Sequence, residues 1–128
     1  MNGKSEAWRK GIELRRKMFG HAGAEVAQEA ASEIGEPLQD YVTEFCFGDI
    51  WQREGLTNRE RSMLVVAMLT GANRMKQVRV HIEGALANGV KPEELREIFL
   101  LAMSYLGIPA AAEPTFMLEA MLKDRAET

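Results

Sequence analysis

The sequence predicts an all-helical fold, a single-domain bundle of about six to seven helices. Apolar residues recur at spacings of three and four along most of the chain, which is the period of an α-helix. Val, Ile and Thr are sparse, and no stretch alternates cleanly between apolar and polar residues as a half-buried strand does. The 128 residues contain no internal repeat and no low-complexity segment. This length predicts one domain over residues 1–128.

Three helices are predicted in the N-terminal part of the chain. The N-terminal helix is assigned to about residues 1–18, and its apolar pattern runs over residues 5–19. A short alanine-rich helix follows at 24–33. Pro37 suits the first turn of a third helix, because its missing N–H is not needed there. That helix is predicted to end near Phe47, since Gly48 is a natural residue just past a helix end. The loop GDIWQREG follows.

Four further helices are predicted over residues 57–71, 74–88, 92–106 and 110–123. Thr57 and Glu60 have the spacing of a capping box, in which each side chain serves an unpaired backbone N–H. Gly89 ends the second of these helices, and Pro92 occupies the first position of the third. Pro114 fits the last helix only near its start or at a kink. The charged residues 124–128 are predicted to fray.

Composition and charge exclude several classes of function. The net charge of −3 and the pI near 5.5 disfavour non-specific nucleic-acid binding, which needs a basic face. No run of about 20 apolar residues predicts a membrane span, and the N-terminus lacks the apolar core of a secretory signal. Cys46 is the single cysteine and is expected to be a small buried hydrophobe. These features predict a cytoplasmic protein without an intrachain disulfide.

Metal and cofactor sites are not predicted. The two histidines are far apart, and the chain has no His-x-x-x-His or Cys-x-x-Cys pair, so good metal ligands are too few. Neither a glycine-rich phosphate loop nor a Gly-x-Ser-x-Gly elbow is present. His21 lies in a predicted loop and is expected to be exposed.

Polar residues occupy the face of the helix at 74–88 that the apolar pattern points inward. The face consists of Arg74, Gln77, Val78, His81, Ala85 and Asn88, whereas the opposite face carries Lys76, Arg79, Glu83 and Ala87. Four inward polar residues indicate either a polar pocket within the bundle or a buried hydrogen-bond network.

The neighbouring helices add further candidates. On the helix at 57–71 the inward stripe is Arg61, Leu64, Val65, Met68 and Ala72. Arg61 is then an inward cation in a first turn, where it holds an anion, extends its charged end to solvent, or pairs with a carboxylate across a subunit contact. On the helix at 92–106 the inward residues are Leu95, Ile98, Phe99, Ala102, Tyr105 and Leu106. Tyr105 is expected to bury its ring while its hydroxyl finds a partner.

Asp49 lies between aromatic residues and is expected to cap a turn or pair with an arginine. From the residue pattern alone, the sequence predicts a helical bundle with an inward cluster of Arg61, Arg74, Gln77 and His81. Two cations and a titratable imidazole suit an acidic small molecule, and no cofactor is needed.

Several segments, in this order and spacing, resemble one known family. They are FGDIWQREGLTNRERSMLVVAMLTGANR, HIEGALANGV and PEELREIFLLAMSYLGIPAA. They resemble the carboxymuconolactone decarboxylase family, within the alkylhydroperoxidase-like helical superfamily. The resemblance implies an all-α homotrimer or homohexamer. It also implies a cofactor-independent lyase of the protocatechuate (β-ketoadipate) branch of aromatic catabolism, which removes CO2 from γ-carboxymuconolactone to give β-ketoadipate enol-lactone.

The resemblance also implies roles for individual residues. The family histidine falls on His81, the hypothesised acid that delivers a proton to carbon, and Arg61 is the hypothesised anion anchor. Gln77 stands where the family usually has glutamate, so it can orient an imidazole but cannot exchange a proton. Arg74, Ser62, Tyr105, Asp49 and Trp51 are the candidate substrate-binding residues.

Two alternatives remain at this level. One is a lyase or isomerase that acts on another small acidic lactone. The other is a non-catalytic helical oligomer that binds an anion or a partner protein. The related hydroperoxide reductases use a Cys-x-x-Cys pair, which a chain with one cysteine does not have.

Overall fold

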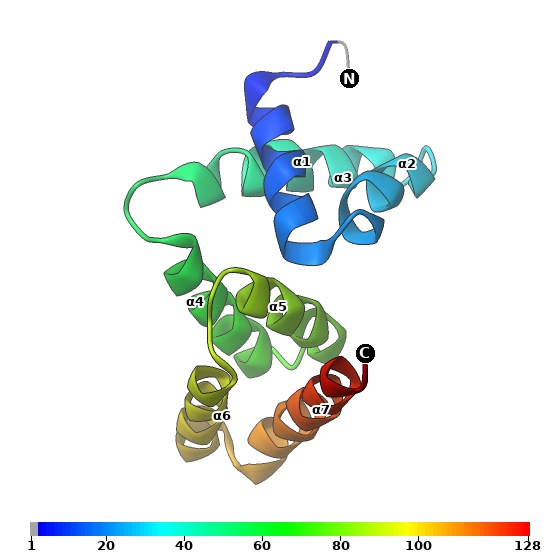
Figure 1. The fold of residues 1–128 in the computed structure, drawn as a ribbon. Coiled ribbons are helices and arrows are strands. Elements are labelled where there is room, and N and C mark those ends of the chain that lie inside the picture. Colours follow the sequence, from blue (N-terminus) through cyan, green and yellow to red (C-terminus); the bar gives the residue numbers. More distant parts are fainter. Residues whose placement is uncertain (1–2) are drawn as a thin grey trace. The chain divides into compact units, whose positions relative to one another are not determined.

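The computed structural model describes residues 3–128, in which every regular element is helical (Figure 1). The α-helices are α1 (Glu6–Phe19), α2 (Ala27–Ala30), α3 (Glu36–Tyr41), α4 (Asn58–Gly71), α5 (Met75–Ala87), α6 (Pro92–Leu106) and α7 (Ile108–Glu127). Two π-helical segments, Ala22–Val26 and Val42–Phe47, and a 3-10 turn, Ile50–Gln52, complete the order. The predicted all-α fold is confirmed.

The chain divides into a first unit, Met1–Asn58, and a second unit, Arg59–Thr128. The single domain over residues 1–128 stays a prediction. Within residues 3–128 no helix is long and apolar enough to cross a bilayer. The cytoplasmic location also stays a prediction.

In the first unit, glycines allow α1 to lie directly on the segment Val42–Phe47. A Cβ at Gly11 would overlap the carbonyl oxygen of Thr43, and one at Gly48 would overlap that of Ala7. Gly48 does follow the last helical residue, as predicted, but the predicted reason is wrong. Its φ of −90° is right-handed, so close backbone approach rather than a left-handed turn requires glycine there.

A buried arginine organises the interior of the first unit. Arg15 donates to Thr43 Oγ1 at 2.7 Å and to Gln39 Oε1 at 2.9 Å, and it also reaches the Gly23 carbonyl at 3.2 Å. Burial lowers the pKa of this guanidinium. Because its hydrogen-bond acceptors here are neutral, Arg15 ties α1 to three other segments without a direct ion pair in these contacts.

The second unit, α4 to α7, encloses its own apolar core. The core consists of Val66, Val78, Ile82, Ala85, Val90, Leu95, Phe99, Leu118 and Met121. Helix α7 packs against both α5 and α6, and it follows α6 directly after Gly107 (Figure 1). Pro92 begins α6 and Gly107 ends it, as predicted.

Two tight helix ends fix how α5 is connected. Asn73 takes a left-handed φ of 57° after α4, and Arg74 N–H bonds the Leu69 carbonyl at 3.0 Å. After α5, Gly89 has a φ of 88°, and Val90 N–H bonds the Ala85 carbonyl at 2.9 Å. Both patterns match Schellman-type ends. The predicted stop at Gly89 is therefore confirmed with its reason.

Helix α7 departs from the prediction at both ends. It begins at Ile108 instead of residue 110, and Pro114 lies inside it. It continues to Glu127, so residues 124–127 are helical here, and the fraying of residues 124–128 stays a prediction. An ion pair between Arg125 and Glu83 of α5, at 3.5 Å, gives the last turns a partner that local sequence does not reveal.

Candidate functional site

His81 lies in the middle of α5 at the edge of its buried face. Val78, Ile82 and Ala85 are fully buried, whereas the imidazole of His81 is only partly covered. Burial lowers the pKa of His81 from 6.5 to about 4. The side chain is therefore neutral near pH 7, and it takes a proton readily only where a negative charge is brought beside it.

Arg74 and Gln77 do not point inward, so this part of the sequence prediction is wrong. Both are exposed in the second unit. Arg74 is the residue before the first turn of α5, beyond the packed part of the helix. Gln77 lies about 100° around the helix from Val78, on the solvent side of His81. Their predicted roles in catalysis and binding stay predictions.

The predicted inward stripe on α4 is also wrong. Leu64 is 48% exposed and Met68 is 64% exposed, whereas Ser62, Val66 and Thr70 are buried. The buried face of α4 is therefore not the predicted one. Because α4 is apolar on nearly every side, the spacing of its apolar residues does not indicate which side faces the core. The small hydroxyls can enter the core because they are bonded, as Thr70 Oγ1 is to the Val66 carbonyl at 2.7 Å.

Ser62 and Asn88 join α4 to α5 inside the second unit. Asn88 Nδ2 donates to Ser62 Oγ at 3.0 Å, and both side chains are buried. Asn88 lies on the inward face of α5, as the sequence predicts. Ser62 has no exposed surface, so its predicted contact with substrate, which stays a prediction, would require some opening of this pair.

An ion pair at the start of α4 escaped the sequence reasoning. Arg59 pairs with Glu94 in the first turn of α6, and Glu94 also accepts the Lys91 N–H at 2.9 Å. The partners are 35 residues apart, and no local pattern links them. Arg59 is engaged with Glu94, and Arg61 is half-buried in the first turn of the same helix. Its role as an anion anchor stays a prediction.

Tyr105 is 82% exposed, and its predicted inward position is wrong. It lies in an apolar groove of about 480 Å3 between α4 and α6. The lining residues are Met63, Leu64, Ala67, Gly71, Ile98, Leu101, Ala102, Tyr105 and Leu106. Among these nine residues only Tyr105 has a polar side-chain group, so the groove offers little to hold an anion.

Asp49 and Trp51 belong to the first unit. Asp49 is exposed and precedes the 3-10 turn without a capping hydrogen bond from its side chain. Trp51 is buried, with its ring 5.4 Å from that of Phe47. Cys46 is half-buried, and His21 is exposed as predicted. The substrate-binding roles of Asp49 and Trp51 stay predictions.

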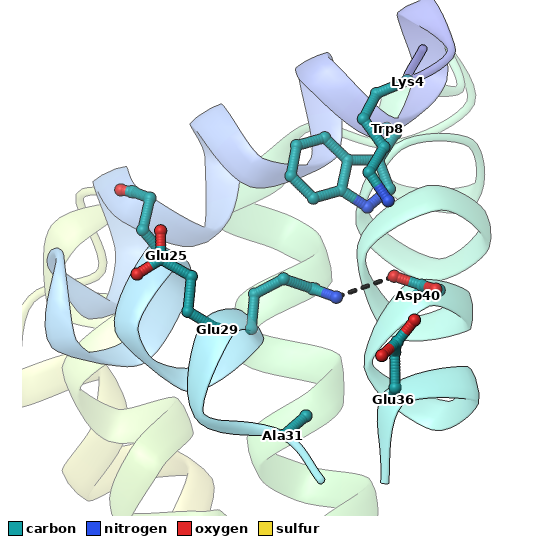
Figure 2. A pocket seen from close by; sticks show the side chains of 8 residues that line it. Lys4, Trp8, Glu25, Glu29, Ala31, Glu36 and Asp40 are labelled. Atoms are coloured by element: carbon teal, nitrogen blue, oxygen red, sulfur yellow. Dashed lines mark hydrogen bonds between the residues drawn. The ribbon is translucent and has the colours of Figure 1, made fainter. Parts of the chain in front are cut away.

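The polar pocket of the first unit has the wrong charge for an acidic ligand. It holds about 310 Å3, and Figure 2 shows Lys4 and Trp8 facing Glu29, Glu36 and Asp40 across it. Its fourth carboxylate, Glu25, bonds Arg16 at 2.8 Å and His21 at 3.1 Å, which lowers the pKa of Glu25. Four carboxylates against one lysine repel an anion.

Among residues 3–128 there is also no group of three or more His, Cys, Asp or Glu side chains placed to hold a metal ion. The carboxylates that line the pocket of the first unit do not suit an acidic small molecule, so the candidate site is sought in the second unit.

The fold and this site define a class of protein: an all-helical protein with a desolvated imidazole on α5 and an arginine in the first turn of α4. The chain belongs to the carboxymuconolactone decarboxylase family, whose profile matches residues 36–117. This match confirms the resemblance described above.

Two relatives resemble nearly the whole chain. The 4-carboxymuconolactone decarboxylase of Acinetobacter baylyi is 29% identical over 119 residues, which cover 93% of this chain and 89% of that protein. Nitrosuccinic acid decarboxylase npaB of Metarhizium robertsii is 32% identical over 117 residues, covering 91% of this chain and 82% of that protein. The family and both names support a carboxy-lyase activity.

Proposed function

We propose that this protein is a cofactor-independent carboxy-lyase that acts on γ-carboxymuconolactone and forms β-ketoadipate enol-lactone. The observation that carries this proposal is the half-buried His81 of α5, in a chain that matches this decarboxylase family. A proton must reach carbon after CO2 leaves, and a partly covered imidazole is suited to deliver it.

The names of the two relatives point to a shared kind of substrate. Carboxymuconolactone carries its departing carboxylate where the resulting electron pair can spread into a conjugated lactone carbonyl. Nitrosuccinic acid carries one beside a nitro group, which accepts electrons in the same way. Each of these molecules also has a second carboxylate. A small dicarboxylate with an adjacent electron acceptor is therefore the substrate class that we infer.

The reaction balances with one proton. The bond from carbon to the departing carboxylate breaks, its electron pair enters the conjugated acceptor, and the carbanion then takes a proton from His81. In the free protein His81 is neutral at pH 7, because its pKa is about 4. The negative charge of the substrate favours the imidazolium. We therefore propose that His81 takes up its proton together with the substrate.

The spacing in the second unit supports Arg61 as the anchor for the other carboxylate. The bond between Ser62 and Asn88 brings the start of α4 beside the end of α5, so the two helices run antiparallel. His81 precedes Asn88 by seven residues, about 10 Å along the helix axis. An extended arginine side chain and a small dicarboxylate together can span such a separation.

The experiment offers the lactone to purified protein and follows CO2 release and ultraviolet absorbance. The wild type should turn over, and His81→Ala should lose at least about a hundred-fold in rate, since general acids contribute this much. His21→Ala, which changes the exposed histidine, is the matched control and should keep its rate. Full activity in His81→Ala would refute the assigned acid.

A second substrate tests the carboxy-lyase activity separately from the identity of its substrate. A wild type that is inactive on the lactone but releases CO2 from nitrosuccinic acid would keep the carboxy-lyase and replace its substrate. The relative named for that acid is the specific observation that favours this second candidate.

We also propose that the protein self-associates as a homotrimer or homohexamer, with a second copy covering the groove between α4 and α6. Leu64, Leu101 and Tyr105 are exposed there without a charged neighbour in the lining. Large exposed apolar patches usually mark such contacts. Sedimentation should show an assembly that Leu101→Glu weakens, whereas a monomeric wild type would refute the proposal.

A further inference from the structure

We propose that the hydrogen bond between Ser62 and Asn88 is a positioning contact for decarboxylation, setting the register of α5 against α4 and thereby the place of His81 relative to Arg61. The inference rests on the proposed function. Neither Ser62 nor Asn88 need touch the reacting atoms for this role. Ser62 directly follows Arg61 in the chain, and Asn88 shares a helix face with His81.

Both ends of the contact are held firmly. Asn88 is 9% exposed and Ser62 is completely covered. Asn88 is the last residue before Gly89, where the backbone turns left-handed and Val90 N–H closes back onto the Ala85 carbonyl. This helix end fixes where the amide of Asn88 points. Ser62 lies in the second turn of α4 beside the buried Val66, so its hydroxyl is equally constrained.

Apolar packing alone defines this register poorly. A slip of one residue moves a helix by about 1.5 Å and turns it by about 100°. A displacement of about 1 Å at a reacting group can cost on the order of a hundred-fold in rate. The short connection at Asn73 excludes a slip by a whole residue, and the directional bond between Ser62 and Asn88 excludes the smaller displacements that the aliphatic side chains around Val78 and Ile82 leave open.

The energetics favour a geometric role over simple stabilisation. Asn88 Oδ1 is buried without a hydrogen-bond partner among the described residues. A buried acceptor left unpaired costs about 1–3 kcal/mol. An apolar residue would avoid that cost, so stability alone does not explain an amide at position 88. A role of Asn88 in orienting α5 against α4 does explain the amide.

Thr70 provides a matched control on the same helix. Its hydroxyl is also buried, but it donates to the Val66 carbonyl within α4 and makes no bond to α5. Ser62→Ala and Thr70→Val therefore each remove one buried, bonded hydroxyl of α4. Only the first breaks the link between the helices.

The experiment compares Ser62→Ala, Asn88→Leu, their double variant and Thr70→Val. Urea unfolding gives the stability, and decarboxylation gives kcat and KM. We expect kcat to fall at least about ten-fold in both single variants but not in Thr70→Val, since misplacement acts on the reacting groups. The double variant should regain stability, because no half-satisfied pair remains, without regaining kcat. Recovery of kcat together with stability would overturn the proposal.

A second readout separates this inference from the proposed reaction. The ring-proton resonance of His81 is followed by NMR as a function of pH in the wild type and in each variant. A positioning role predicts that the His81 titration moves in Ser62→Ala and Asn88→Leu but not in Thr70→Val. If no protein releases CO2, the reaction is wrong, and this titration still decides the positioning role. An unmoved His81 would refute it. Should Ser62→Ala fail to fold, Asn88→Leu and the double variant give the same comparison.

Discussion

The low pKa of His81 makes a quantitative prediction about stability in acid. Its pKa is about 4 in the folded protein, against 6.5 for an unperturbed histidine. Between these two values the unfolded chain binds a proton that the folded chain does not. Stability due to this residue is therefore complete above pH 6.5 and is lost as the pH falls toward 4. Below that pH both states carry the proton, and the loss stops growing.

The size of the effect follows from the two pKa values. Linkage gives a loss of about 2 kcal/mol at pH 5 and about 3 kcal/mol at pH 4, relative to pH 7.5. A loss of this size is a large part of the stability of a typical domain. Because it arises from burial of the imidazole, it should vanish when a side chain that does not titrate replaces His81.

The assay is urea unfolding of the wild type, His81→Gln and His21→Gln at several pH values between 4 and 7.5. The difference in unfolding free energy between wild type and His81→Gln should shrink by about 2 kcal/mol from pH 7.5 to pH 5. His21→Gln, which changes the exposed histidine, serves as the matched control. A difference between wild type and His81→Gln that does not change with pH would show that His81 titrates normally and is not desolvated.

Two further predictions concern single substitutions. Gly11→Ala should destabilise the first unit by about 1–3 kcal/mol in urea unfolding, because its new Cβ meets the Thr43 backbone. Gly71→Ala, whose Cβ would meet only Leu106 at 3.9 Å, should be neutral or stabilising; equal effects would refute the close-approach argument. Gln77→Glu should raise the rate of CO2 release from γ-carboxymuconolactone if the missing carboxylate limits the reaction. If the wild type is weakly active and Gln77→Glu does not raise its rate, Gln77 is not the cause of the weak activity.

Helix ends set by local chemistry could be predicted from the sequence. Gly89 ends α5, Pro92 begins α6 and Gly107 ends α6, each because the residue's own backbone preference decides the conformation. The end of α7 could not be predicted in this way. Its last turns are held by Arg125 on Glu83, which is a contact between distant residues.

The candidate site was predictable only in part for a similar reason. Periodicity placed His81 at a buried face, and the resemblance selected it among the polar residues. The pairs Arg59–Glu94 and Ser62–Asn88 depend on how α4, α5 and α6 pack together, so no local sequence pattern predicts them. Periodicity also misplaced Gln77, because a stripe drawn through every third or fourth residue is wider than the face that is actually covered.

The failure on α4 and α6 carries information of its own. The predicted stripes through Leu64 and Met68 on α4 and through Tyr105 and Leu106 on α6 have helical spacing, yet these side chains are exposed in the second unit. Hydrophobic periodicity identifies a face that is to be covered, and it does not distinguish a subunit's own core from a contact with another subunit. The same residues that misled the search for the core are therefore those expected to meet a second copy. Under this interpretation the sequence signal was real, and the error lay in assigning it to one chain.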